Sequence, residues 1–400
     1  QAEDGIRHQP RSRGLGDVYK RQVIRSATHF FDPGATSLVL IGESHLSIHT
    51  WPEYGHATVD VFVCGEKDPW IAYRVIEERL KPKEAKVVEL PRGISPPSEL
   101  GTPPCVVDKV VPGFCLVYVP TKYLHREVTE HQRIDLVEHE VFGKILFLDD
   151  KAQVSTFDEW IYHEALVHPA MVAHPNPKRV LILGGGDGGA LREVLKHRCV
   201  EHVTLVDIDP RVIEMSKKLI PEISAGAFDD PRTELVFADG RRFVEEYRGE
   251  PFDVAIVDVT DPISGISAKL FTKEFYEALK RVVRRDGVVC TQAEDVYLSH
   301  YTFEISFPTI VKTMESVFRV VRPLRAWIPV FGTEWGFCIA SEEVDPTSLT
   351  REEVEARLSE RGVETKFYCP EVHHALFAFP KNVAKNVEEL GRVVCDEDLD

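Results

Sequence analysis

The stretch Arg179–Gly189, with the sequence RVLILGGGDGG, joins a short apolar run to a cluster of glycines. The apolar run at residues 180–183 predicts a buried strand, and residues 190–195 show an amphipathic pattern typical of a helix. A strand, a glycine loop and a helix in this order are typical of nucleotide-binding α/β folds. Asp187 lies inside the loop, where a carboxylate would repel a pyrophosphate group. The loop therefore predicts a cationic ligand, such as a sulfonium or amine nucleoside, rather than a dinucleotide.

Strands and helices alternate from about residue 178 onward. Apolar runs of strand length are found at residues 180–183, 203–206, 234–237, 254–257, 288–291 and 337–340. This alternation predicts a doubly wound, Rossmann-like (methyltransferase-like), mostly parallel sheet.

Carboxylates follow nearly every one of these expected strands. Ligands of open α/β sheets bind beyond the C-terminal ends of the strands, so acids at those ends should share one crevice. Their mutual repulsion would be relieved by a bound polycation. Helix N-capping could account for one or two of them, but not for all five. The five acids are Asp187, Asp207, Asp239, Asp258 and Asp261.

The composition excludes several classes of protein. A formal net charge of −17 argues against a nucleic-acid partner and suits cationic ligands. No apolar run reaches membrane-spanning length, and no secretory signal is recognisable. The eight cysteines form no CxxC pair, which argues against a zinc site and predicts reduced thiols in a cytoplasmic protein.

The length of 400 residues predicts two or three domains. The N-terminal residues are polar and without periodicity, and Arg11–Gln22 resembles a translated adapter remnant. A natural disordered tail is the alternative. Six prolines between Pro91 and Gly113 predict a linker. The expected parts are a disordered, non-native leader at 1–22, an α+β domain at 23–93, a Pro-rich linker at 94–113, a small antiparallel β-unit at 114–165 and the Rossmann-like domain at 166–400.

The segment 23–93 has strand patterns at 36–41, 57–63 and 85–90 and a helical pattern at 70–80. The sequence ESHLSIHTWPE, residues 43–53, is expected between two of these strands. With the later FVCG sequence around Cys64, it resembles the small bacterial and archaeal S-adenosylmethionine decarboxylases, which use a pyruvoyl group.

This resemblance implies a self-cleaving chain. Glu43 would become the last residue of one fragment, and Ser44 would become the pyruvoyl group that forms a Schiff base with the substrate amine. His49 would be the base of the processing reaction, and Cys64 would be the proton donor after decarboxylation.

Two further positions, Phe30 and Glu53, are implied to contact the substrate. The family begins with a strand and a helix that are not recognisable here, so the domain is expected to be N-terminally truncated and its self-processing is open. Members of the family also decarboxylate ornithine or arginine. The domain could instead be a structural module that does not cleave.

The region from Phe114 to Leu390 resembles the spermidine synthase family of aminopropyltransferases. The resemblance is carried by HPNPKRVLILGGGDGGALREVLKH at 174–197, DVTDP at 258–262 and YCPEVH at 368–373. It implies that Asp258 and Asp261 orient and deprotonate the attacking amine, without a metal. The positions implied to hold decarboxylated S-adenosylmethionine are Gln132, Asp187, Asp207, Asp239, Gly240 and Asp258, and those implied to line the acceptor side are Gln153, Tyr162, His163 and Asp261.

The two resemblances together predict a bifunctional enzyme of polyamine biosynthesis. Decarboxylated S-adenosylmethionine would donate an aminopropyl group to putrescine, which yields spermidine and methylthioadenosine. Agmatine or spermidine could be the acceptor instead, because Phe331 replaces a frequent family tyrosine and the EWGF sequence at 334–337 is more like thermospermine synthases. A methyltransferase that uses intact S-adenosylmethionine would also fit the glycine loop. A homo-oligomer, dimer or tetramer, is expected.

Overall fold

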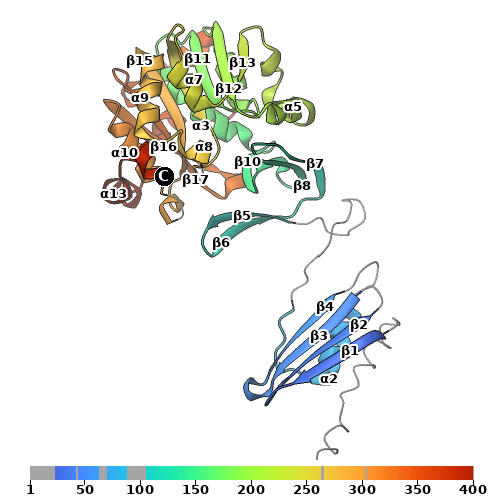
Figure 1. The fold of residues 1–400 in the computed structure, drawn as a ribbon. Coiled ribbons are helices and arrows are strands. Elements are labelled where there is room, and N and C mark those ends of the chain that lie inside the picture. The colour runs from blue at the N-terminus through green and yellow to red at the C-terminus, as the bar shows by residue number, and fades with distance from the viewer. Residues whose placement is uncertain are drawn as a thin grey trace, which may run out of the picture. The chain divides into compact units, whose positions relative to one another are not determined.

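The computed structural model describes residues 23–41, 44–62, 70–87, 105–262, 265–301 and 304–399. The chain divides into two compact units, one ending at Arg92 and the other beginning at Gly93. Figure 1 shows an antiparallel sheet with one helix in the first unit and a larger α/β assembly in the second.

The first unit is a four-stranded antiparallel sheet with the strand order β1-β2-β3-β4. One face of the sheet packs on helix α2, and their small core comprises Leu46, Ala72 and Ile76, with Ile48 and Val61 packed against it. The elements are β1 (Val23–Phe30), β2 (Ala35–Ile41), β3 (Ser44–Trp51), the short η2 (Pro52–Tyr54), β4 (His56–Phe62) and α2 (Trp70–Leu80).

The decarboxylase-like motif lies between the strands expected at 36–41 and 57–63, and residues 44–51 of it form a further strand, β3. The pattern allows this, because Leu46 and Ile48 alternate with polar residues and face α2. The strand expected at 85–90 is not formed at residues 85–87, where Val87 is exposed and pairs with no described strand, and its remainder lies outside the described residues.

The second unit begins with antiparallel strands in two small sheets. Strands β5 and β6 form a hairpin, and the other four form a sheet of order β10-β9-β8-β7. The hairpin corrects the expected linker at 94–113, because residues 106–113 belong to β5 and its turn. Pro112 and Gly113 form that turn, with a φ of +83° at Gly113, rather than continuing a linker. The strands are β5 (Val106–Val111), β6 (Phe114–Tyr118), β7 (Lys122–Val128), β8 (Arg133–His139), β9 (Gly143–Leu148) and β10 (Lys151–Ser155).

The main sheet has seven strands in the order β13-β12-β11-β14-β15-β17-β16. The first five are parallel, whereas β17 is antiparallel to both β15 and β16. The predicted doubly wound, mostly parallel architecture is thereby confirmed. The strands are β11 (Arg179–Gly184), β12 (His202–Asp207), β13 (Thr233–Phe237), β14 (Phe252–Asp258), β15 (Val283–Asp295), β16 (Val320–Ile328) and β17 (Thr333–Ser341).

Strand β16 was not expected from the sequence. Its interior Pro323 cannot donate a ladder hydrogen bond, which is tolerated because β16 is an edge strand.

The domain boundary expected between residues 165 and 166 was also wrong, since both residues lie inside the continuous helix α3 (Glu159–Ala173). The helices are α3 (Glu159–Ala173), α4 (Gly189–Lys196), α5 (Pro210–Leu219), α6 (Pro221–Ser224), α7 (Gly240–Glu246), α8 (Gly265–Ala268), α9 (Lys273–Val282), α10 (Phe307–Glu315), α11 (Arg351–Arg361), α12 (Pro370–Leu376) and α13 (Lys381–Leu390), with short 3₁₀ turns η3 (Ala227–Asp229), η4 (Ser299–Tyr301), η5 (Pro329–Phe331), η6 (Pro346–Ser348) and η7 (Asp396–Leu399).

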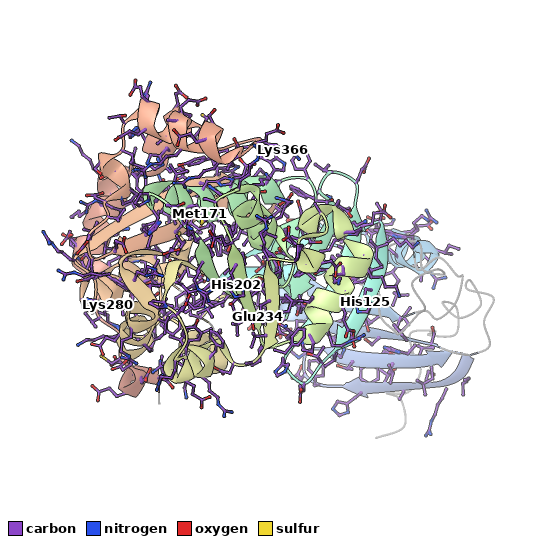
Figure 2. All side chains as sticks on the ribbon, turned by 90° about the horizontal axis from the view of Figure 1, so that it is seen from above. His125, Met171, His202, Glu234, Lys280 and Lys366 are labelled. Carbon is purple, nitrogen blue, oxygen red and sulfur yellow. The ribbon has the colours of Figure 1, made fainter. Side chains whose placement is uncertain are left out.

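Strand β11 is buried on both faces of the main sheet. Val180 and Ile182 pack into one hydrophobic cluster with residues of α3 and α4, among them Met171, which is fully buried (Figure 2). Leu181 and Leu183 pack into a second cluster with α9 and α10. Each such side chain contributes about 1.5–3 kcal/mol on burial, so the strand is a rigid base for the loop that follows it.

Candidate active site

The glycine loop after β11 allows close approach of neighbouring groups. Gly184 has a φ of +78°, and a Cβ there would lie 2.1 Å from the Asp258 carbonyl oxygen. A Cβ on Gly189 would lie 2.1 Å from the imidazole ring of His163. Larger residues at these positions would therefore push β14 and α3 away from the loop.

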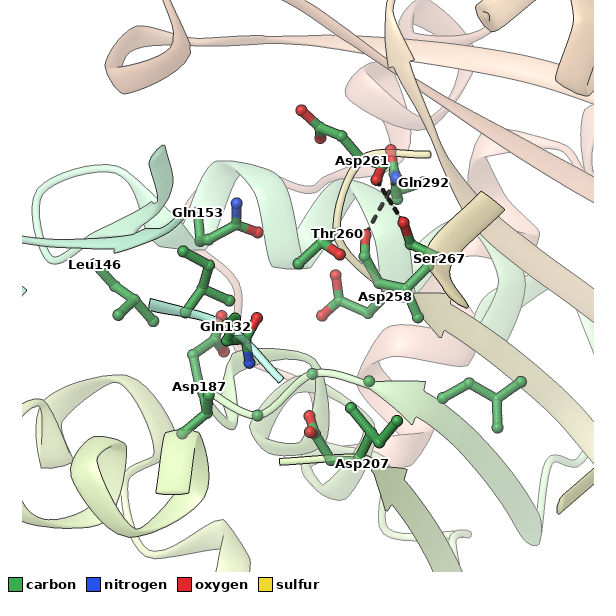
Figure 3. Close-up of a pocket in the computed structure, with 18 of the residues that line it drawn as sticks. Gln132, Leu146, Gln153, Asp187, Asp207, Asp258, Thr260, Asp261, Ser267 and Gln292 are labelled. Atoms are coloured by element: carbon green, nitrogen blue, oxygen red, sulfur yellow. Dashed lines mark hydrogen bonds between the residues drawn. The ribbon is translucent and has the colours of Figure 1, made fainter. Parts of the chain in front are cut away.

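A cavity of about 420 Å³ opens above this loop, at the C-terminal ends of β11, β12 and β14. Figure 3 shows Asp207 toward one end of the cavity, Asp261 toward the other and Asp258 between them. Most of the transferase residues predicted from the sequence line this space. They are Gln132, Gln153, Tyr162, Asp187, Asp207, Gly240, Asp258 and Asp261.

His163 lies behind Asp187 and holds it in place. Its Nε2 is 3.3 Å from Asp187 Oδ1, and its Nδ1 is 2.8 Å from Glu159, which also forms a bidentate pair with Arg192. Burial by itself would lower the pKa of His163, but Asp187 and Glu159 raise it well above its ordinary value. Burial opposes ionisation of Asp187 too, yet His163 and the Gly189 N–H lower its pKa. Asp187 therefore remains a carboxylate beside an imidazolium.

Asp239 contributes to the site from a different position. Its carboxylate accepts a hydrogen bond of 2.9 Å from the Arg242 backbone N–H and caps α7, while the adjacent Gly240 lines the cavity. Of the five acids at strand ends, Asp239 thus fits the helix-cap explanation, and Asp187 bonds the Gly189 N–H at the start of α4. Asp207, Asp258 and Asp261 cap no helix among the described residues.

Asp258 has one engaged oxygen and one open oxygen. The Tyr162 hydroxyl donates a 2.8 Å hydrogen bond to Oδ1, whereas Oδ2 is buried and has no hydrogen-bond partner among the described residues. Burial and the charge of Asp187 raise the pKa of Asp258 to about 6. A carboxylate with a free lone pair and such a pKa is suited to accept a proton near neutral pH.

Two more acids of the cavity have similarly raised pKa values. Burial, together with the charges of Asp209 and Asp187, raises the pKa of Asp207 to about 6. Burial and the charge of Asp108 raise the pKa of Asp261 to about 6, against the opposing charge of Lys151. These acids are concentrated in a site that a cationic ligand would neutralise.

Glu294, near the end of β15, was not predicted from the sequence as a site residue. It is 1% exposed and has a φ of +70°, which is rare for a residue with a side chain. Its Oε1 makes no hydrogen bond within the described part of the chain, and burial and Asp261 raise its pKa well above the ordinary value. The sequence pattern that identified the five acids also applies to Glu294, because Glu294 follows the expected strand 288–291 just as each of those acids follows an expected strand.

Aromatic rings form one wall of the cavity. Tyr162 and Phe331 have ring centroids 6.0 Å apart, and those of Phe331 and Trp335 are 4.9 Å apart. All three line the cavity. Such rings pack against the methylene groups of an aliphatic amine and attract its cationic nitrogen. Among the described residues, no group of three or more His, Cys, Asp or Glu side chains is arranged to hold a metal ion.

In the first unit, the predicted decarboxylase residues are spread along β3. Ser44 begins the strand, and its hydroxyl donates a 2.5 Å hydrogen bond to the Phe62 carbonyl of β4. His49 follows five residues later and contacts Thr36 Oγ1 at 2.9 Å. Since side chains alternate along a strand, an odd interval directs Ser44 and His49 to opposite faces.

Phe30 and Glu53 lie toward the far end of β3 from Ser44. Phe30 pairs with Ala35, which pairs with Thr50, and Glu53 is in η2 just beyond the strand. Six residues separate Ser44 from Thr50, a span of about 20 Å at the usual rise of a strand. One chain therefore does not bring these residues to Ser44. Glu43 and Cys64 lie outside the described residues.

Comparison with known proteins places this geometry in a family. Residues 159–350 match the spermine/spermidine synthase domain, and residues 107–156 match the spermidine synthase tetramerisation domain. The polyamine aminopropyltransferase of Korarchaeum cryptofilum is 41% identical over 280 residues, which cover 70% of this chain and 85% of that protein. The chain belongs to the polyamine aminopropyltransferase family.

A second aminopropyltransferase sequence and two spermidine synthase structures are also similar to this chain. The protein of Pyrobaculum aerophilum is 46% identical over 255 residues, which cover 63% of this chain and 86% of the relative. The spermidine synthase structure from Thermotoga maritima superimposes with a TM-score of 0.65 at 35% identity, covering 75% of this chain and 98% of that one. A spermidine synthase in complex with the transition-state analogue AdoDATO gives a TM-score of 0.66, also at 35% identity and with the same shares of both chains covered.

The first unit belongs to a second family. Residues 14–93 match S-adenosylmethionine decarboxylase, so the chain is a fusion of a decarboxylase domain with an aminopropyltransferase. The predicted fusion and enzyme class are thereby confirmed. The match begins inside residues 1–22, where a non-native leader was expected, so part of that segment aligns with the family. No described helix is long and apolar enough to cross a membrane.

Proposed function

We propose that the aminopropyltransferase part moves the aminopropyl group of decarboxylated S-adenosylmethionine to putrescine, which gives spermidine and methylthioadenosine. The observation that carries this proposal is the open Oδ2 of Asp258 in an acid-lined cavity. Asp187 and Asp207 attract the cationic donor, and Asp261 supplies negative charge for the far ammonium of the diamine. The aromatic wall excludes water from the methylene chain.

In this proposal the chemistry is an in-line displacement. The neutral amine nitrogen attacks the carbon next to the sulfonium, a C–N bond forms, and the C–S bond breaks with its electron pair on sulfur. Asp258 Oδ2 takes the proton that the nitrogen releases, while the Tyr162 hydroxyl holds Oδ1. Methylthioadenosine leaves as a neutral thioether.

The decarboxylase part is proposed to make the donor from S-adenosylmethionine with a pyruvoyl group formed at Ser44. Bound there, this group would supply an electron sink for decarboxylation. The structure is compatible with cleavage at this point, because Ser44 is the first residue of β3 and a new terminus would leave the β3 pairing at residues 45–51 intact. Cys64 and His49 are the proposed proton donor and processing base.

The decarboxylase part of the proposal requires an oligomer. Ser44 is too far from Phe30 and Glu53 within one chain, so a site that contains all three would draw them from two copies. The match to a tetramerisation domain fits a homo-oligomer, dimer or tetramer. The seven described cysteines are all free thiols, which fits a cytoplasmic enzyme.

One observation favours a second function for the first unit. The Ser44 hydroxyl is hydrogen-bonded to the Phe62 carbonyl and faces away from His49, so the unit could serve as a structural module whose chain is never cleaved. If the unit does cleave, ornithine or arginine could be its substrate in place of S-adenosylmethionine. In the second unit, agmatine or spermidine could take the place of putrescine as acceptor.

Product analysis tests the proposed transfer. The purified chain is expected to convert decarboxylated S-adenosylmethionine and putrescine into equal amounts of methylthioadenosine and spermidine, measured by mass spectrometry. The matched control contains intact S-adenosylmethionine and an inhibitor of the pyruvoyl group, and should give neither product. Release of S-adenosylhomocysteine in that control would instead indicate a methyltransferase and contradict the proposal.

Donor affinity is expected to depend on pH. The pKa values near 6 of Asp207 and Asp258 mean that these groups are ionised above pH 6 and lose their charge as the pH falls through 6. Affinity for the sulfonium donor should therefore fall by about tenfold per pH unit below 6 for each carboxylate that must be ionised. Calorimetric titration from pH 5 to 8 measures this. Methylthioadenosine is an uncharged control whose affinity should hardly change, and an equal loss for both ligands would count against charge recognition.

A further inference from the structure

Lys151 places a positive charge beside Asp261, which lines the acceptor end of the cavity. It is the first residue of β10, and its Nζ lies 2.9 Å from Asp108 Oδ1 and 4.0 Å from Asp261 Oδ2. The ammonium also donates a 2.6 Å hydrogen bond to the Lys109 carbonyl. The side chain is only 18% exposed, so this charge is held in one place.

The groups around Lys151 come from three elements. Asp108 and Lys109 belong to β5, and Asp261 follows β14 and lines the cavity. Asp261 also interacts with Glu294 of β15, whose pKa is raised by burial and by Asp261. Strand β5 packs against both β10 and the η4 turn, so the hairpin closes the space behind this cluster.

These charges limit the length of a bound polyamine. A diamine offers one distal ammonium, which Asp261 in the cavity lining can neutralise. A triamine carries one more cationic nitrogen, which would have to lie farther from Asp258, toward the Asp108–Asp261 pair. The Lys151 ammonium lies beside that pair, 2.9 Å from Asp108 and 4.0 Å from Asp261, and two ammonium groups so close together repel each other.

We propose that Lys151 sets the acceptor length, because its ammonium takes the place of a third acceptor nitrogen and makes the site select diamines over triamines. This inference rests on the proposed aminopropyl transfer. Lys151 is a specificity residue and takes no part in the displacement.

The test compares two acceptors in Lys151→Ala, which removes both the charge and the length of the side chain. With decarboxylated S-adenosylmethionine as donor, kcat/KM is measured for putrescine and for spermidine on the full chain. The ratio of spermidine to putrescine is expected to rise by roughly tenfold or more over that of the unaltered chain. The change should come mainly from a lower KM for spermidine, with kcat for putrescine altered less than about threefold.

Two further variants keep the result interpretable. Lys151→Arg retains the cation and should keep the ratio of the unaltered chain. Lys151→Ala with Asp108→Asn avoids leaving the buried Asp108 carboxylate without the opposite charge of Lys151, and should also raise the ratio if the single variant does not fold. The role of Lys151 would be overturned by an unchanged or lower ratio in the folded alanine variants, or by a preference for spermidine in the unaltered chain. Either result would leave the proposed transfer itself standing. Absence of methylthioadenosine with every amine would overturn the transfer itself, and the inference with it.

Discussion

Replacing Asp258 with asparagine is expected to lower kcat for aminopropyl transfer by roughly 10²- to 10⁴-fold, the usual contribution of a general base. An ammonium has no lone pair, so the acceptor must lose a proton before or during attack. Asp258 Oδ2 is buried and has no hydrogen-bond partner among the described residues. Burial and the charge of Asp187 raise the pKa of the Asp258 carboxyl group to about 6. An asparagine keeps the shape and the hydrogen bond to Tyr162, but its amide cannot take the proton. Steady-state kinetics with both substrates saturating measures the loss.

Asp207→Asn is the matched control for Asp258→Asn. It removes the same charge from the same cavity, at the end where Asp207 accepts a 2.8 Å hydrogen bond from the Asp209 N–H. Its expected effect is a higher KM for the donor, with kcat changed less than about threefold. If Asp258→Asn changed only KM, or lowered kcat less than tenfold, then Asp258 would be a binding group and not the base.

The location of the transferase acids could be predicted because parallel strands impose it. Asp207 and Asp258 end β12 and β14, two strands on either side of β11, so the sheet itself brings them together. The position of Asp187 could be predicted by the same rule, because Asp187 lies in the glycine loop that follows β11. Their meeting point depends on local pattern and sheet order, and both can be recognised in one sequence.

The acceptor end could not be predicted in the same way. Asp108 lies in a segment that its prolines made look like a linker, and Lys151 begins a strand of another sheet. They meet Asp261 only because the β5–β6 hairpin packs on β10, a contact between residues about 40 positions apart that no periodicity encodes. Similarly, the decarboxylase motif identified Ser44 and His49, but its spacing does not show that one strand carries both on opposite faces.

Replacing Ser44 with alanine is expected to abolish both self-cleavage and decarboxylation. The proposed cleavage needs the Ser44 hydroxyl to attack the preceding carbonyl, so that the amide becomes an ester and then breaks. Alanine has no hydroxyl, and the pyruvoyl group could not form. The chain should remain at its full mass of 45.3 kDa, whereas the unaltered chain should divide into residues 1–43 and 44–400. Intact-mass measurement and release of labelled carbon dioxide from S-adenosylmethionine report the two losses.

Ser47→Ala is the control on the same strand. Ser47 is three residues along β3 from Ser44 and has no part in the proposed cleavage, so its loss should leave cleavage unchanged. Both variants should transfer the aminopropyl group normally when decarboxylated S-adenosylmethionine is supplied, because the cavity of the second unit lies entirely within residues 130–335. Cleavage that persists in Ser44→Ala would exclude this serine as the nucleophile. An unaltered chain that never divides would instead make the first unit a structural module, as the hydrogen bond from Ser44 to Phe62 allows.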